Sequence, residues 1–461
     1  MTKFCAFSLL LLCPCFAVAQ DVLTADFPAS LEYVDVSLCF AGEAPNRLYR
    51  HDDAGKYSNG IFHAGSRLNI STNGYSARLP RLPENACIKW RTDFTALIKK
   101  KDYRLLLQRG RDLEMSANLW FWKGPRSRDL VVDIELPDGM SFSTPWKEVA
   151  ETDGINRYRP DKTSSSWESR IAVGHFEIDY IDVPGARIRL AAIGDLSSSQ
   201  REKIGRWIEQ TVTTVSTVHG HLPQAQPQVL VIPIGARKRP VVMAQVLRGG
   251  GLAAEFYIDE TRPLEEFTHD WKATHEFSHM LVPYISSRDR WLSEGLASYY
   301  QNVLQARDGR LTETEAWQKL YEGFKRGENG THGGSLAQAT RDGRRSTMRV
   351  YWSGAALMLM ADMQLRGQSG GRQSLDTALQ SLSGCCMDNA KTWRARDMFR
   401  QLDQLTETKI FSRLYEKYIH DDHFPDMQPI FQDLGIRTRH SRVSLYEDAP
   451  MAVVRSAIMK G

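Results

Sequence analysis

The chain has 461 residues, too many for one ordinary hydrophobic core, so two or three domains are expected. Apolar residues make up 42% and charged residues 25%, as is typical of soluble globular proteins. The formal net charge is only +4, which gives no reason to expect a nucleic-acid partner.

The first twenty residues predict export. Lys3 supplies a positive start, an apolar run follows, and residues 17–19 (AVA) match the small-x-small pattern of signal-peptide cleavage. The apolar run is shorter than the roughly 20 residues that a membrane-spanning helix needs. We therefore expect a signal peptide over residues 1–19, a periplasmic or secreted mature chain, and no transmembrane anchor after cleavage.

Three domains are predicted in chain order. Residues 20–195 contain short runs of strand-forming residues punctuated by Gly, Pro, Asn and Asp, which favours an antiparallel β-sandwich. Residues 196–345 combine a helical segment, further strands and then more helices. Residues 346–461 are predicted to form a helical domain with an irregular tail from residue 436. The expected fold class is α+β multidomain.

Four cysteines lie beyond the predicted signal peptide, at positions 39, 87, 385 and 386. Three fully paired connectivities are possible. Cys385 and Cys386 are adjacent, with Cα atoms about 3.8 Å apart, which is closer than a relaxed disulfide prefers. We predict a Cys39–Cys87 disulfide in an oxidising compartment and leave the adjacent pair open as free, strained or structural. A four-cysteine zinc site is the alternative, but CxxC spacing is absent.

The stretch HEFSH, residues 275–279, predicts a zinc site. On a helix, His275 and His279 lie on one face one turn apart and can present two imidazoles to one cation. Glu276 is offset by about 100°, beside the metal rather than on it, where a carboxylate can take a proton from water. The alternative is a surface helix that happens to carry two histidines.

The segment that follows supplies a third ligand. WLSEGLASYY, residues 291–300, carries Glu294 on the next predicted helix. Two histidines and one glutamate leave a coordination position open, as a catalytic zinc requires. Apolar flanking residues such as Phe277 and Trp291 indicate a semi-buried site. We therefore predict one Zn²⁺ per chain, bound by His275, His279 and Glu294.

A glycine-rich segment precedes the motif. GGGLAAEFYID, residues 249–259, is interpreted as a glycine turn leading into an edge strand, to which an extended peptide can add. This interpretation makes Gly251, Leu252, Ala253 and Glu255 the candidate substrate contacts.

These motifs carry a resemblance. HEFSH followed by WLSEGLASYY resembles the gluzincin metallopeptidases, most of all the glycyl aminopeptidase family and more distantly aminopeptidase N and leukotriene hydrolase. IELPDGMSFSTPW (134–146) is similar to that family's β-domain, and YWSGAALMLMADMQLR (351–366) to its helical domain. The similarity extends over about 130 to 435, and the family's PDZ domain is expected to be absent.

The resemblance implies a β N-domain, a thermolysin-like catalytic domain over 196–345 and a helical C-domain. It implies that the two histidines and Glu294 bind zinc, that Glu276 is the general base, and that Tyr351 stabilises the oxyanion. The implied function is an exported zinc metallopeptidase that hydrolyses a peptide or protein substrate.

The sequence departs from the family at two further places. Only fourteen residues separate His279 from Glu294, which shortens the connecting loop. Ala253 stands where the family has a glutamate that binds the substrate's free amine, and Glu255 follows two residues later. We predict an enzyme without strict aminopeptidase selectivity. The alternatives are a strict aminopeptidase that uses Glu255 through a bulge at 249–251, or a non-catalytic peptide-binding protein on the same fold.

Overall fold

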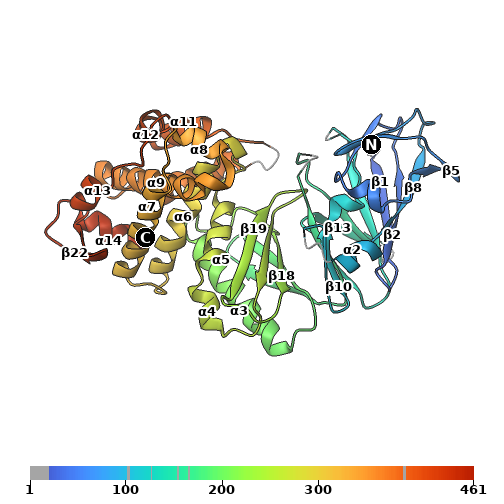
Figure 1. Ribbon diagram of the computed structural model, residues 1–461, viewed down its shortest axis with the longest axis horizontal. Helices are drawn as coiled ribbons and strands as arrows, with labels where there is room; N and C mark the ends of the chain where they lie inside the picture. The colour runs from blue at the N-terminus through green and yellow to red at the C-terminus, as the bar shows by residue number, and fades with distance from the viewer. Residues whose placement is uncertain (1–19, 101–103, 126, 153–154, 165–166, 388–390) are drawn as a thin grey trace, which may run out of the picture.

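The computed structural model describes residues 20–100, 104–125, 127–152, 155–164, 167–387 and 391–461. The N-terminal half of the chain is built from β-sheets, a mixed sheet occupies the middle, and helices make up the C-terminal half (Figure 1). The predicted α+β multidomain class is therefore confirmed. The predicted signal peptide lies outside the described residues.

The N-terminal domain contains three sheets. The first has eight strands: β13 (Lys147–Thr152), β14 (Ile155–Arg159), β11 (Leu130–Glu135), β1 (Asp21–Asp26), β2 (Tyr33–Cys39), β8 (Cys87–Asp93), β4 (Phe62–His63) and β5 (Ser66–Arg67). The second has four: β12 (Ser141–Ser143), β15 (Arg170–Gly174), β10 (Asp112–Ser116) and β9 (Leu106–Arg109). The third consists of β3 (Arg47–Tyr49), β7 (Ser76–Arg78) and β6 (Ser71–Asn73).

The pairing in these sheets follows the alternation of side chains. Buried and more exposed residues alternate strictly along β2 and β8, so one face of the pair packs on the core. The pairing departs from the predicted antiparallel sandwich at one place, since β1 runs parallel to β11. About a hundred residues connect those two strands, enough for the crossover that a parallel pair needs.

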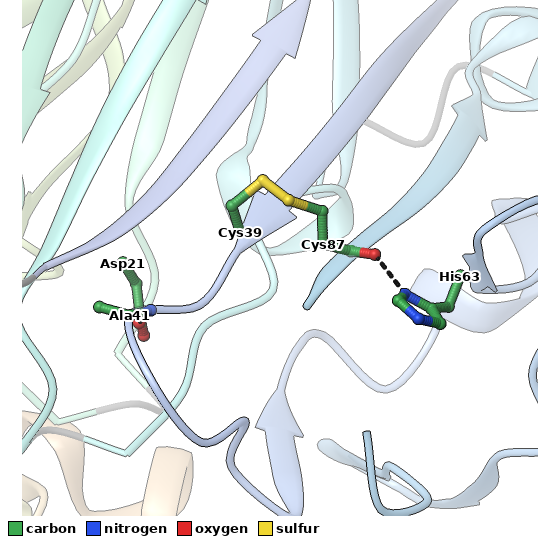
Figure 2. The surroundings of a disulfide bond; sticks show 5 residues. All are labelled: Asp21, Cys39, Ala41, His63 and Cys87. Atoms are coloured by element: carbon green, nitrogen blue, oxygen red, sulfur yellow. Dashed lines mark hydrogen bonds between the residues drawn. A yellow bond between two sulfur atoms is a disulfide. The ribbon is translucent and has the colours of Figure 1, made fainter. Parts of the chain in front are cut away.

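The predicted disulfide is present. Cys39 and Cys87 lie directly opposite each other on β2 and β8, and their sulfur atoms are bonded (Figure 2). A ring nitrogen of His63 lies 2.8 Å from the carbonyl oxygen of Cys87. Cys385 and Cys386, whose state the sequence left open, are bonded to each other at the end of α10 (Leu375–Cys386).

Loss of the Cys39–Cys87 bridge is expected to destabilise the protein. The bridge closes a loop with a sequence separation of 48, so replacing both cysteines by serine should cost about 2–4 kcal/mol of unfolding free energy. The denaturant midpoint of the variant measures this loss. Replacing Cys385 and Cys386 by serine is the matched control, because a bond between adjacent residues removes little chain entropy. Equal midpoints for the two variants would contradict the prediction.

The central sheet has the order β16 (Ile178–Val183), β17 (Ala186–Ala192), β18 (Gln228–Pro233), β20 (Ala253–Ile258) and β19 (Val241–Leu247). β20 pairs parallel with β18 and antiparallel with β19, so β19 is the edge strand. The expectation that the segment after the glycines forms the edge is therefore wrong. All six residues of β20 are buried, as in an interior strand.

The helical part surrounds one long buried helix, α9 (Thr347–Ser369). Besides α10, the other longer helices are α3 (Ser198–Ser216), α6 (Arg290–Arg307), α7 (Glu313–Asn329), α11 (Ala395–Thr406), α12 (Ile410–Tyr418) and α14 (Ala452–Lys460). Shorter ones are α4 (Leu264–His269), α5 (Trp271–Ser278), α8 (Leu336–Arg341) and α13 (Gln428–Asp433). Among the described residues, no helix is long and apolar enough to cross a membrane.

The segment over 436–461 is not the irregular tail that the sequence suggested. It forms a hairpin of β21 (Ile436–Arg439) and β22 (Arg442–Leu445), followed by α14. The buried side chains of Ile458 and Met459 explain why this short helix is stable, since tertiary packing stabilises helices that are marginal alone.

The N-terminal domain packs directly on the central sheet. An apolar cluster joins Leu107 of β9 and Ala172 of β15 to Leu230 of β18 and to Tyr257 of β20. The carboxylate of Asp112 on β10 accepts bonds at 2.6 Å from the backbone N–H groups of His175, directly after β15, and of Gly194, in the loop after β17. These contacts fix the N-terminal domain against one face of the central sheet.

Candidate metal centre

The two histidines come from one short helical segment. Asp270 caps α5 by accepting a bond at 2.9 Å from the backbone N–H of Lys272, and α5 passes at His279 into a 3-10 turn, η2 (His279–Leu281). Ala273 and Phe277 are fully buried and hold the helix against the core. The imidazole rings of His275 and His279 then lie on one face, with centroids 5.0 Å apart.

Glu294, from α6, faces both rings. Its Oε2 lies 3.3 Å from Nε2 of His275 and 3.6 Å from Nε2 of His279. One ligand atom from each of these three residues lies within 4.8 Å of the others. The structure thus brings together the three metal ligands that the sequence predicts.

Two side chains that the sequence analysis missed orient the imidazoles. Nδ1 of His275 lies 2.8 Å from Oε1 of Gln301, and Nδ1 of His279 lies 2.9 Å from Oγ of Ser293. Because an amide oxygen accepts, Nδ1 of His275 carries the proton and its Nε2 keeps a free lone pair for a cation. Gln301 follows Glu294 by seven residues on α6, so helical spacing places both on one face.

The electrostatics favour the ligating forms of Glu294 and His279. Burial alone would raise the pKa of Glu294, but its contact with His275 and the charge of the nearby imidazoles lower it to about 2. Burial lowers the pKa of His279 to about 4, with His275 and Arg248 acting in the same direction. At neutral pH, Glu294 is therefore anionic and His279 is neutral, as metal ligation requires.

Glu276 lies beside the ligands rather than among them. Its carboxylate accepts a bond from the backbone N–H of Val246 on β19, and burial raises its pKa to about 7. It lines the same cavity as His279 and Glu294. A carboxylate poised near neutrality at this place can take up and release a proton.

Tyr351, on α9, completes the group. Its ring lies nearly parallel to that of His275, with an interplanar angle of 9° and centroids 5.8 Å apart. Its hydroxyl is hydrogen-bonded to Glu294, and burial holds its pKa well above the usual value. The phenol therefore stays protonated and remains a donor at the edge of the cluster.

Two glycines let α9 approach α6 closely enough to place Tyr351. A Cβ atom on Gly354 would lie 2.0 Å from the backbone oxygen of Trp291, and one on Gly295 would lie 2.3 Å from backbone atoms of Gly354. The backbones of the two helices are thus in direct contact one turn from Tyr351 and next to Glu294. Only glycine fits at this crossing.

Substitution of Gly354 by alanine is expected to push these helices apart. We expect a loss of about 1–3 kcal/mol of unfolding free energy, because backbone atoms cannot yield as a flexible side chain can. Denaturant unfolding measures the loss. The matched control is Gly367→Ala on the same helix, where the added methyl meets only the flexible end of Met451. Unchanged stability of Gly354→Ala would contradict this description of the crossing.

The cluster opens onto a cavity of about 550 Å³. The edge strand β19 and the residue after it contribute residues 244–248 to the lining, which also includes Glu276, Glu294 and Tyr351. The free edge of β19 offers backbone groups to an extended chain.

The substrate contacts predicted on β20 do not line this cavity. Gly251, Leu252, Ala253 and Glu255 are all buried away from it, because β20 lies inside the sheet behind β19. The carboxylate of Glu255 is fully buried and accepts bonds from Gln245 and from the hydroxyl of Tyr257.

The donor set suits zinc. Two imidazole nitrogens and one carboxylate oxygen converge within 4.8 Å, and the open side of the cluster faces the cavity. Nitrogen and carboxylate donors in this number match catalytic zinc sites, which keep one position for water or substrate. The residues present therefore fit a zinc ion.

About nine-tenths of the chain resembles solved structures of the aminopeptidase N and M1 metallopeptidase kind at low sequence identity. An aminopeptidase N family protein from Idiomarina loihiensis is 12% identical with a TM-score of 0.71, and the match covers 90% of this chain and 78% of that one. The M1 zinc metallopeptidase from Deinococcus radiodurans is 14% identical with a TM-score of 0.54, covering 88% and 93%. Yeast LTA4 hydrolase in complex with bestatin is 13% identical with a TM-score of 0.56, covering 89% and 68%.

No family model matches the sequence, and no curated protein matches it. The likeness is one of structure, and it extends over about nine-tenths of the chain. The protein therefore has a fold similar to that of the M1 zinc metallopeptidases, and its His275, His279 and Glu294 cluster resembles a zinc site.

Proposed function

We propose that this protein is an exported zinc metallopeptidase. The observation that carries the proposal is the convergence of three metal ligands, a buried carboxylate and a protonated phenol on one cavity beside a free strand edge. Each group has a role in peptide hydrolysis.

In this proposal, His275, His279 and Glu294 would hold a zinc ion, which would supply a Lewis acid to the reaction. The edge of β19 holds the substrate backbone extended along the cavity. Glu276 takes a proton from the water that attacks the carbonyl carbon, then delivers it to the leaving amine. Tyr351 donates a hydrogen bond from its hydroxyl to the oxygen that gains negative charge in the transition state.

Peptide as the substrate class rests on two supports. A variant of the Deinococcus radiodurans metallopeptidase has been crystallised with Tyr-Ser-Ala as its substrate. The sequence motifs of this chain resemble the glycyl aminopeptidase family, which belongs to the same gluzincin group. A non-catalytic peptide-binding protein is the rival, but such a protein has no need of Glu276 beside the ligands.

We further propose that the enzyme lacks strict aminopeptidase selectivity. Recognition of a free α-amine requires a carboxylate at the end of the cleft, and Glu255 lies buried behind the edge strand. Peptides with a blocked N-terminus should therefore be cleaved at least as well as free ones. Export is proposed from residues 1–19 and agrees with two disulfides, since such bonds persist in oxidising compartments.

Metal analysis combined with a peptide assay tests the proposed function. We expect about one zinc per purified chain and hydrolysis of a mixed peptide library. His279→Ala should lose both, whereas His269→Ala, which removes an exposed histidine at the end of α4, should lose neither. A zinc-loaded protein that cleaves no peptide would favour the non-catalytic rival. Stoichiometric zinc in His279→Ala would refute the ligand assignment.

A further inference from the structure

Two arginines line the cavity next to the metal cluster. Arg248 follows the end of the edge strand β19, and Arg290 begins α6. The charge of Arg248 helps to lower the pKa of His279, and that of Arg290 opposes the rise in the pKa of Tyr351. Both guanidinium groups are therefore close enough to act on the groups around the metal cluster.

Neither arginine has a carboxylate partner within the described part of the chain. Nη2 of Arg248 donates to the carbonyl oxygens of His279 at 2.7 Å and Val282 at 3.0 Å. Nη2 of Arg290 donates to the carbonyl oxygen of Gly343 at 2.8 Å, while its Nε is buried with no partner among those residues. Both side chains are partly exposed in the cavity, and a guanidinium without a carboxylate partner has its charge available to a ligand there.

The carboxylates of the cavity are already engaged elsewhere. Glu294 belongs to the metal cluster, and Glu276 is held by the backbone N–H of Val246. The third, Glu168, lies 3.1 Å from the guanidinium of Arg170, outside the cavity lining. With a divalent cation bound, the cavity would carry net positive charge. Such a field attracts a substrate carboxylate and repels a free amine.

We propose that Arg248 and Arg290 bind a carboxylate of the substrate, so that this cleft selects acidic peptides. The inference rests on the proposed peptidase function and specifies its substrate class. The carboxylate is either an Asp or Glu side chain or a free C-terminus near the scissile bond. A guanidinium presents a fork of N–H donors that matches the two oxygens of a carboxylate.

Arg248 also has a structural role, because it caps the last carbonyls of the segment that carries His279. If Arg248 has only this structural role, its substitution should weaken the binding of every peptide alike. If it also contacts a substrate carboxylate, the substitution should weaken the binding of the acidic peptide only. The test therefore compares matched peptides across variants rather than one peptide with one variant.

The experiment uses full-length mature protein loaded with zinc and carrying Glu276→Gln, so that peptides bind without turnover. Calorimetry measures Kd for Ac-Ala-Ala-Glu-Ala-Ala-Ala-NH₂ and for the same peptide with Gln in place of Glu. The comparison is repeated with the Glu or Gln placed at each position of the peptide. A second pair, Ac-(Ala)₆ with a C-terminal acid or amide, separates a side-chain carboxylate from a chain end. We expect the acidic member of at least one pair to bind about tenfold tighter or more.

Arg248→Gln and Arg290→Gln should each reduce that preference several-fold, since glutamine keeps an N–H donor for the backbone carbonyls but loses the charge. Arg288→Gln, which removes an exposed charge outside the cavity, should preserve the preference. If both members of every Glu/Gln pair and of the acid/amide pair bind with equal affinity while the parent enzyme still hydrolyses peptides, the inference is overturned. The proposed peptidase function would be unaffected.

The same peptides are also measured without the acetyl group. If they bind more tightly than the acetylated ones and Glu168→Gln abolishes this difference, Glu168 is an amine receptor and the inference is overturned. Absence of both binding and hydrolysis for all peptides would refute the proposed function together with the inference.

Discussion

Replacing Glu276 by glutamine is expected to lower kcat/KM for peptide hydrolysis by roughly 10²–10⁴-fold, the usual contribution of general acid–base catalysis. An amide has nearly the shape of the carboxylate but cannot accept the proton from water. Glu276 lies beside His275, His279 and Glu294 without belonging to the cluster, so the variant should keep its zinc.

The kinetic and metal measurements are made on the same preparation. Glu265→Gln, an exposed glutamate on α4, is the control for loss of one negative charge and should keep the parent rate. A parent rate in Glu276→Gln would mean that another group is the base. Loss of zinc together with activity would instead make Glu276 part of the metal site.

The pH dependence follows from the same carboxylate. Glu276 must be ionised to act as a base, so kcat/KM should rise as the pH passes upward through its pKa. Burial places that pKa at about 7 in the metal-free protein. A bound cation favours the ionised form and lowers the pKa, so the acidic limb of the profile is expected below pH 7.

The metal ligands could be predicted from the sequence because their geometry is local. The spacing of His275 and His279 fixes their relation on one helix turn, and the resemblance of the flanking motifs supplies Glu294. Gln301 could have been found by the same spacing along α6. The Cys39–Cys87 pair could be predicted because the adjacency of the other two cysteines makes long-range pairings to them less favourable.

The order of strands in the central sheet could not be predicted in the same way. β19 and β20 are both short apolar runs flanking a glycine turn, and either sequence is compatible with an edge position. Their places are decided by pairing with β18, which lies some twenty residues upstream of β20. That contact is non-local, so the substrate residues predicted on β20 were assigned to the wrong strand of the hairpin.

The C-terminal segment was missed for a related reason. α14 is short, and its sequence has no strong helical signal. Its stability depends on Arg455, which is fully buried and forms ion pairs with Glu313 of α7 and with Glu447. The ion pair with Glu313 joins residues more than a hundred positions apart, so no local sequence pattern indicates it. The arginines of the cleft likewise look ordinary in sequence, and only the fold brings them to the cavity.

Replacing Tyr351 by phenylalanine is expected to lower kcat by roughly 10²–10³-fold, the cost of removing one donor to an oxyanion. The phenol is protonated at every pH of interest because burial and Glu294 hold its pKa far above the usual value. Its bond to the developing negative charge is stronger in the transition state than to the neutral carbonyl, so kcat should fall more than KM rises.

The ring of phenylalanine keeps the packing of Tyr351 against His275, so zinc content and unfolding free energy should stay close to those of the parent. Tyr321→Phe on α7, which removes a hydroxyl far from the cavity lining, is the control and should keep the parent kcat. An effect of Tyr351→Phe on KM alone would make the phenol a substrate-binding group. Loss of zinc would instead mean that its bond to Glu294 holds that ligand in place, because the hydroxyl is the only group that the substitution removes.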